Sequence, residues 1–133
     1  GHGVGSFLAV HEGPQRIAKF AGGQAGSDEP LQAGMILSNE PGYYKSGEYG
    51  IRIENLILVE ERTIAGAEGR YFGFETLTFA PIDKNLVDVS LLNSDELHWW
   101  NDYHSKVLAI VGPQLDGEAL AWTKAACAAL TAG

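Results

Sequence analysis

Three residues of this 133-residue chain have side chains and settings that suit a metal ion: His2, Glu40 and Glu54. His2 lies between two glycines, which let the backbone and a ligand approach closely, and a neutral imidazole is a common ligand of transition metals. Glu40 ends a short expected strand and precedes Pro41, which favours extended geometry. The simpler alternatives, an ordinary loop histidine and a solvated turn glutamate, stay open at this point.

Glu54 lies in residues 49–60, YGIRIENLILVE, which predict a strand with apolar side chains on both faces. A carboxylate in such a buried strand needs a cation nearby, because an unpaired buried charge is costly. Arg52, two residues away on the same face, can be that cation. The segment therefore allows two interpretations: an Arg52–Glu54 ion pair along one strand, or a metal ligand at Glu54 with Arg52 orienting a ligand beside it.

One imidazole and two carboxylates form a donor set that suits manganese, cobalt or zinc better than a thiolate site would. Three ligands are too few for two metal ions, so a dinuclear centre would need further carboxylates from outside this chain. The single cysteine, Cys127, is expected in the core on an Ala-rich helix. A lone cysteine excludes an internal disulfide framework and fits a reducing, cytoplasmic compartment.

The elements that must position these residues are mostly strands. Strands are expected within residues 1–14, 35–39, 49–60 and 71–80, the last as the antiparallel partner of a central strand 49–60. Turns are expected at Gly13–Pro14 and at Pro41–Gly42. Residues 15–34 contain four glycines and a proline, which predicts an irregular connection.

The remaining residues have a helical pattern. Helices are expected at residues 94–110 and 117–131. Asn93, with Glu96 three residues later, is typical of a capping box at the first helix, and Asp116 is expected to cap the second. The sequence therefore predicts an α+β fold with an antiparallel sheet region, residues 1–80, followed by a helical extension, residues 81–133.

Composition excludes several classes of partner. The net charge of −8 makes nucleic acid and anionic lipid poor partners, because the protein's field repels phosphate. No apolar run approaches the roughly 18 residues of a membrane-spanning helix. His98 and His104 fall on the first expected helix, where surface or packing roles are the simpler interpretation.

Four motifs appear in a fixed order and together resemble a known family. They are Gly1-His2-Gly3-Val4-Gly5, Val10-His11-Glu12-Gly13-Pro14, Asn39-Glu40-Pro41-Gly42-Tyr43-Tyr44 and Gly50-Ile51-Arg52-Ile53-Glu54-Asn55. The set, with a matching tail that includes residues 73–78 and 88–92, resembles the pita-bread metallopeptidases and specifically the Xaa-Pro aminopeptidases. The resemblance implies the C-terminal part of a pita-bread fold.

The resemblance also implies roles for individual residues. It implies two divalent ions, usually manganese with zinc or cobalt as alternatives, held by two Asp, one His and two Glu. His2, Glu40 and Glu54 match the His and Glu ligands, and Glu40 also matches a catalytic proton acceptor. His11 matches a catalytic, substrate-binding histidine, and Arg52 an arginine that supports the ligands. The two Asp ligands have no match here, so we expect a C-terminal fragment with an incomplete site that is inactive on its own.

The activity implied for the parent protein is hydrolysis of the bond between an N-terminal residue and a following proline. Its partners would be peptides with proline at the second position. Trp99, Trp100, Tyr103 and Trp122 are expected to pack on the sheet, with a homodimer contact as the alternative. Three other functions stay open: a proline dipeptidase, a methionine aminopeptidase, and a pita-bread binding module without metal.

Overall fold

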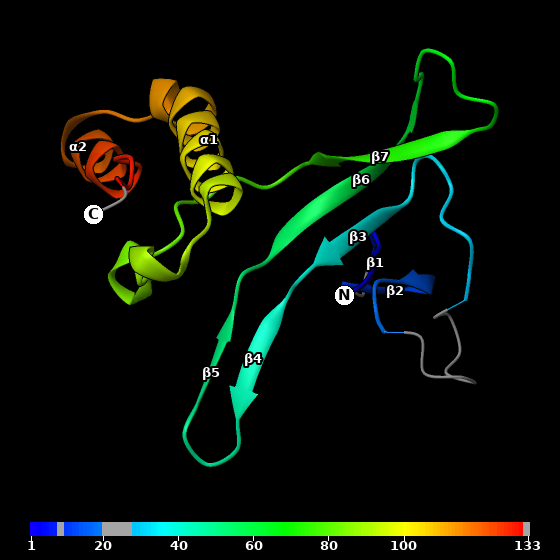
Figure 1. Ribbon diagram of the computed structural model, residues 1–133, viewed down its shortest axis with the longest axis horizontal. Coiled ribbons are helices and arrows are strands. Elements are labelled where there is room, and N and C mark those ends of the chain that lie inside the picture. The colour runs from blue at the N-terminus through cyan, green and yellow to red at the C-terminus, as the bar shows by residue number, and fades with distance from the viewer. Residues whose placement is uncertain (8–9, 20–27, 132–133) are drawn as a thin grey trace. The chain divides into compact units, whose positions relative to one another are not determined.

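The computed structural model describes residues 1–7, 10–19 and 28–131, which form two compact units, Gly1–Thr78 and Phe79–Gly133. The first unit consists of strands and the second of helices (Figure 1). The strands of the first unit are β1 (His2–Val4), β2 (His11–Arg16), β3 (Ile36–Asn39), β4 (Gly42–Lys45), β5 (Tyr49–Arg52), β6 (Asn55–Arg62) and β7 (Tyr71–Thr76). They form a five-stranded sheet in the order β2-β1-β3-β6-β7 and a two-stranded hairpin, β4-β5.

All paired strands are antiparallel. Two of the pairs, β3–β6 and β4–β5, follow one another along the chain and form one long two-stranded ribbon. β3 pairs with β6, with Asn39 opposite Asn55, and β4 pairs with β5, with Gly42 opposite Arg52. The hairpin extends from the β3–β6 pair (Figure 1). The two pairs share one register across the gap, so Glu40 lies opposite Glu54 in the ribbon.

The ribbon is interrupted between its two strand pairs. A single strand over residues 49–60 and a turn at Pro41–Gly42 were expected here, and both expectations are wrong. The chain runs extended from β3 into β4, and strands β5 and β6 are separated by Ile53 and Glu54. The Ile53 N–H donates to the Pro41 carbonyl at 3.1 Å. Pro41 has no N–H to return this hydrogen bond, which explains the break. Glu54 is therefore not in a buried strand, since its side chain is 37% exposed.

The turn expected at Gly13–Pro14 is also wrong, because both residues lie within β2. β2 contains an irregularity instead: Gly3 is opposite Glu12 while His2 is opposite Arg16. The core of this unit consists of Leu37, Ile57 and Val59, with Ile17, Leu31 and Met35 packed against them. β7 is the antiparallel partner of β6, and β6 lies between β3 and β7, so these two expectations are confirmed.

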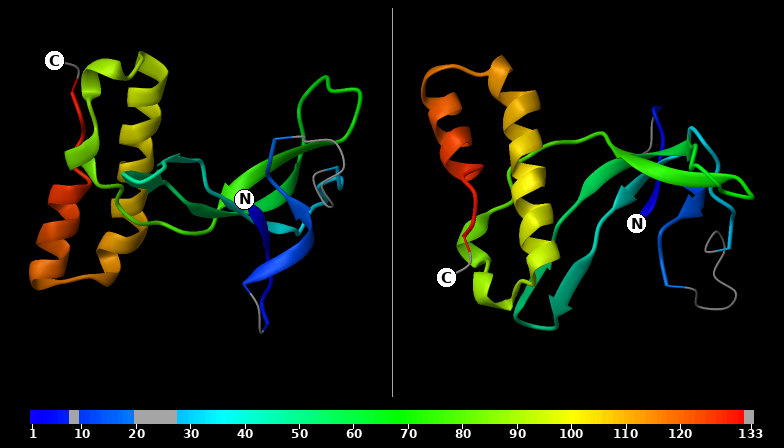
Figure 2. Two further views of the ribbon diagram at one scale, coloured as in Figure 1. Left: turned by 90° about the horizontal axis from the view of Figure 1, so that it is seen from below. Right: turned by 45° about the horizontal axis from the view of Figure 1, so that its top comes forward.

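The second unit contains three short 3-10 helices and two α-helices. These are η1 (Lys84–Leu86), η2 (Val89–Leu91), α1 (Ser94–Val111), η3 (Gly112–Gln114) and α2 (Gly117–Ala126). α1 and α2 lie side by side (Figure 2). The core of the second unit consists of Tyr103, Val107 and Cys127, which confirms the expected burial of the cysteine. Among the described residues, the helices lack the combination of length and apolar composition that a membrane span needs.

The second helix ends at Ala126, five residues before the expected end at 131. The Asn101 side chain of α1 accepts from the Leu130 N–H and donates to the Leu130 carbonyl, each at 2.9 Å. These hydrogen bonds hold Leu130 outside the helix, a feature that helix propensity alone does not predict.

Candidate metal centre

The structure brings together His2, Glu40 and Glu54. One ligand atom from each residue lies within 4.8 Å of the other two. His2 is the first residue of β1, Glu40 follows β3 directly, and Glu54 immediately precedes β6. β1 pairs with β3 through Gly3 and Leu37, and the shared register sets the two glutamates opposite each other. Strand pairing therefore gathers residues that are up to 52 positions apart.

The His2 ring is oriented so that its second nitrogen faces the cluster. Nδ1 lies 2.7 Å from the Gly3 carbonyl oxygen. A carbonyl only accepts hydrogen bonds, so Nδ1 carries the proton in the neutral ring and Nε2 keeps its lone pair. Nε2 lies 3.6 Å from Oε1 of Glu40. This is the tautomer that ligation of a metal ion through Nε2 requires.

Glu40 is held in its ionised form. The Ser38 hydroxyl donates to Oε1 of Glu40 over 2.7 Å, and this hydrogen bond is the main reason that the pKa of Glu40 lies below its ordinary value. Partial burial opposes the shift, whereas the charge of Arg52 adds to it. A carboxylate that is ionised at neutral pH can ligate a metal ion.

Arg52 lies between the two glutamates. Its Nε is 3.1 Å from Glu54 Oε2, and its Nη1 is 3.9 Å from Glu40 Oε2. The ion pair that the sequence suggested is therefore present in the same cluster as the candidate ligands, and the two interpretations of Glu54 are compatible. A hydrogen bond with Tyr44 is the main reason that the pKa of Arg52 is raised, and the negative charge of Glu54 adds to the shift.

Tyr44 is a residue of this site that sequence reasoning missed. Its ring covers Gly42 and Gly50, because a Cβ atom at either glycine would lie within 3.0 Å of Tyr44 ring atoms. Tyr44 pairs with Gly50 across the hairpin. The sequence shows a tyrosine and a glycine six residues apart, but only the strand register shows that Tyr44 and Gly50 lie opposite each other.

His11 lies beside His2 and outside the ligand cluster. The two ring centroids are 4.1 Å apart, and His11 is exposed on β2, opposite Val4. His98 and His104 belong to the helical unit. His98 is exposed and lies 3.2 Å from Asp102, whereas His104 is fully buried and accepts from the Ile82 N–H. Within the described ranges, His2, Glu40 and Glu54 form the one group that could hold a metal.

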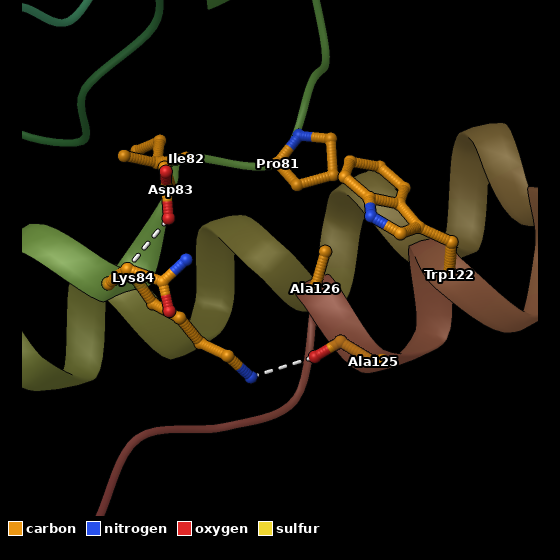
Figure 3. Close-up of a pocket in the computed structure, with 8 residues that line it drawn as sticks. Pro81, Ile82, Asp83, Lys84, Trp122, Ala125 and Ala126 are labelled. Carbon is orange, nitrogen blue, oxygen red and sulfur yellow. Dashed lines mark hydrogen bonds between the residues drawn. The ribbon is translucent and has the colours of Figure 1, made fainter.

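The helical unit contains a pocket of about 470 Å³ (Figure 3). Pro81 and Trp122 form its apolar side, and Lys84 Nζ donates to the Ala125 carbonyl at 2.8 Å. No histidine, cysteine or glutamate is among the described residues that line it. Asp83 offers the one carboxylate among these residues, so the pocket lacks the imidazole and the paired carboxylates of the cluster on the sheet.

Comparison with known proteins finds two matching family models. Residues 1–61 match the model of metallopeptidase family M24, and residues 70–130 match that of the C-terminal region of peptidase M24. "Probable Xaa-Pro aminopeptidase P" of Laccaria bicolor is 49% identical over 98% of this chain and 20% of its own length. Aminopeptidase P2 of Arabidopsis thaliana is 51% identical over 88% of this chain and 16% of its own length.

A solved structure shows the same fold. The X-prolyl aminopeptidase of Caenorhabditis elegans, described as a cytosolic enzyme with a di-nuclear active site, is 40% identical with a TM-score of 0.78. The match covers 97% of this chain and 21% of that chain. The expected α+β fold, the C-terminal part of a pita-bread fold, is confirmed. This chain spans about a fifth of the length of the proteins it matches.

Proposed function

Because the chain belongs to the M24 metallopeptidase family, we propose that it is the C-terminal part of a metal-dependent Xaa-Pro aminopeptidase. The observation that carries the proposal is the convergence of His2, Glu40 and Glu54 within 4.8 Å. Its substrates are peptides with proline at the second position. A bond to proline needs a dedicated enzyme, because the proline nitrogen has no N–H and its ring fixes φ.

The residues of the cluster fit a divalent cation. The two carboxylates lie opposite each other between the strand pairs β3–β6 and β4–β5, and like charges that face each other in this way are destabilising without a compensating positive charge. The single cation of Arg52 is shared between them. Oxygen ligands with one imidazole suit manganese, with zinc or cobalt as alternatives. His2, Glu40 and Glu54 would contribute these ligands to a dinuclear centre, and two Asp outside this chain would complete it.

The chain's own residues then have separate tasks. Bound divalent ions would lower the pKa of a water molecule and polarise the scissile carbonyl. The Glu40 carboxylate, ionised at neutral pH, accepts a proton from the attacking water. His11, exposed beside His2, donates a hydrogen bond to the developing oxyanion, a contact whose loss typically lowers the rate by about 10²–10³-fold. Arg52 holds the Glu54 carboxylate in place through their ion pair, and Tyr44 in turn forms a hydrogen bond with Arg52.

The decisive variant in the parent protein is Glu54→Gln. We expect it to abolish tight Mn²⁺ binding, measured by electron paramagnetic resonance, and hydrolysis of Xaa-Pro-Yaa tripeptides, because a neutral amide replaces an anionic ligand. Glu75→Gln on β7, an exposed position in the same unit, is the matched control and should retain both. An active Glu54→Gln enzyme that holds two ions would overturn the proposal, and turnover of dipeptides alone would overturn the substrate.

Location and assembly form part of the same proposal. A cytoplasmic location is supported by the free, buried thiol of Cys127 and by the cytosolic relative. A homodimer is supported by exposed aromatic side chains of the helical unit, such as Trp99 and Trp122. Light scattering of the parent protein tests the dimer, and a monomer at all concentrations would refute it.

A further inference from the structure

Ser38 is a completely buried polar residue that lies next to the candidate ligands. It occupies β3 between Leu37 and Asn39, and its accessible surface is 0%. It lies two residues before Glu40 on the same extended stretch, so both side chains point to one face. A buried hydroxyl must find hydrogen-bond partners, and those of Ser38 identify its role.

The hydroxyl of Ser38 connects two of the three candidate ligands. It accepts from the His2 backbone N–H at 2.9 Å and lies 2.7 Å from Glu40 Oε1. The His2 carbonyl lies 3.3 Å from the same oxygen. A hydroxyl has one proton, and the shorter contact with the charged carboxylate is the stronger one. Ser38 therefore donates to Glu40 while it accepts from His2.

This arrangement sets the distance between the two ligands. β1 and β3 share a single partner pair, Gly3 with Leu37. The contact between His2 and Ser38 adds a second connection at the end where the imidazole lies. The contact between Ser38 and Glu40 fixes Oε1, the same oxygen that lies 3.6 Å from His2 Nε2.

We propose that Ser38 is a positioning residue that holds His2 and Glu40 at metal-binding distance through one shared hydroxyl. The inference rests on the proposed metal centre. An alanine at this position leaves the partly buried His2 N–H and a Glu40 carboxylate oxygen without this partner, whereas a threonine keeps the hydroxyl. Cysteine occupies a similar volume but is only a weak donor.

The test compares Ser38→Ala, Ser38→Cys and Ser38→Thr in the parent protein. Ser38→Ala should weaken Mn²⁺ binding about 10–100-fold, the range found when partners of metal ligands are removed. Ser38→Thr should restore it, and Ser38→Cys should fall between them. The visible absorption bands of the Co²⁺-loaded protein should shift in Ser38→Ala and return in Ser38→Thr, because they report ligand geometry.

Thr123→Ala is the matched control, since it removes another buried hydroxyl, which donates to the Ala119 carbonyl in the helical unit. It should leave Mn²⁺ affinity unchanged. Wild-type affinity and an unchanged Co²⁺ spectrum in both Ser38→Ala and Ser38→Cys, with binding lost in Glu54→Gln, would overturn the role of Ser38 alone. Mn²⁺ binding unaffected by Glu54→Gln would overturn the metal centre and this inference with it.

Discussion

At the scale of single residues, close contacts with neighbouring strands decide which side chain a position can hold. Gly3 shows this beside His2: a Cβ atom there would lie 2.6 Å from the Glu12 carbonyl oxygen and 2.7 Å from the Gln15 amide. β2 can therefore approach β1 closely only because this position has no side chain. Gly3 was expected to let the backbone and a ligand approach closely, and the backbone that approaches here is β2.

Cys127 gives the clearest dependence on pH at this scale. Burial raises the pKa of its thiol above the ordinary 9.0, with a smaller opposing effect of Lys84. The folded unit therefore disfavours the thiolate, so its stability is complete below pH 9 and declines as the pH rises through the raised pKa.

We expect the wild-type protein, measured by urea unfolding, to lose stability relative to Cys127→Ala as the pH rises above 9, because the variant has no thiol to ionise. Groups that titrate in both proteins cancel in this comparison. We also expect the thiol to react with aromatic disulfides only as fast as the unit opens. Rapid modification at pH 7 in the folded protein would show that the thiol is accessible.

Helix ends illustrate how elements differ despite similar sequence signals. Asn93 caps α1: its side chain accepts from the N–H groups of Asp95 and Glu96, and the Glu96 carboxylate accepts from the Asn93 N–H. Asp116 occupies the corresponding position of α2, but its side chain makes no capping hydrogen bond. The expected capping box is confirmed, whereas the cap at Asp116 lacks its hydrogen bond.

The two caps should therefore respond differently to alanine. Asn93→Ala should lower the free energy of unfolding by about 1 kcal/mol, the usual cost of removing an N-cap side chain. Asp116→Ala should cost clearly less, because no backbone N–H loses its acceptor. Urea titrations of both variants measure the difference. Equal losses would mean that Asp116 caps α2 in solution.

At the scale of the whole molecule, the two units have separate hydrophobic cores. Leu37, Ile57 and Val59 form the first, and Tyr103, Val107 and Cys127 the second. All three tryptophans lie in the second unit. Tryptophan fluorescence therefore reports the unfolding of the helical unit, whereas amide signals of β6 report the sheet.

Core truncations should separate the two units. Leu37→Ala should cost the sheet unit about 2–5 kcal/mol, the usual range for a buried leucine, and leave the fluorescence transition in place. Val107→Ala should lower the free energy of unfolding of the helical unit by at least about 1.5 kcal/mol. The fluorescence transition should then move to a lower urea concentration, and the β6 signals should not change. If either variant moves both probes together, the units unfold as one.

Features that depend on contacts between neighbouring residues could be predicted from the amino-acid sequence. The helix at 94–111 could be predicted because capping bonds join residues two or three positions apart. The burial of Cys127 followed from its apolar surroundings on an Ala-rich segment. His2, Glu40 and Glu54 could be named as candidates because their residue types and flanking glycines and prolines are visible in order.

Features that depend on residues far apart in the chain could be found only from the folded structure. The register that sets Glu40 opposite Glu54, the shared hydroxyl of Ser38 and the position of Tyr44 all follow from which strands pair. So does the end of α2, where Asn101 binds the chain. A shift of one residue would turn each side chain to the other face of the strand, and only the packing of distant segments selects one register.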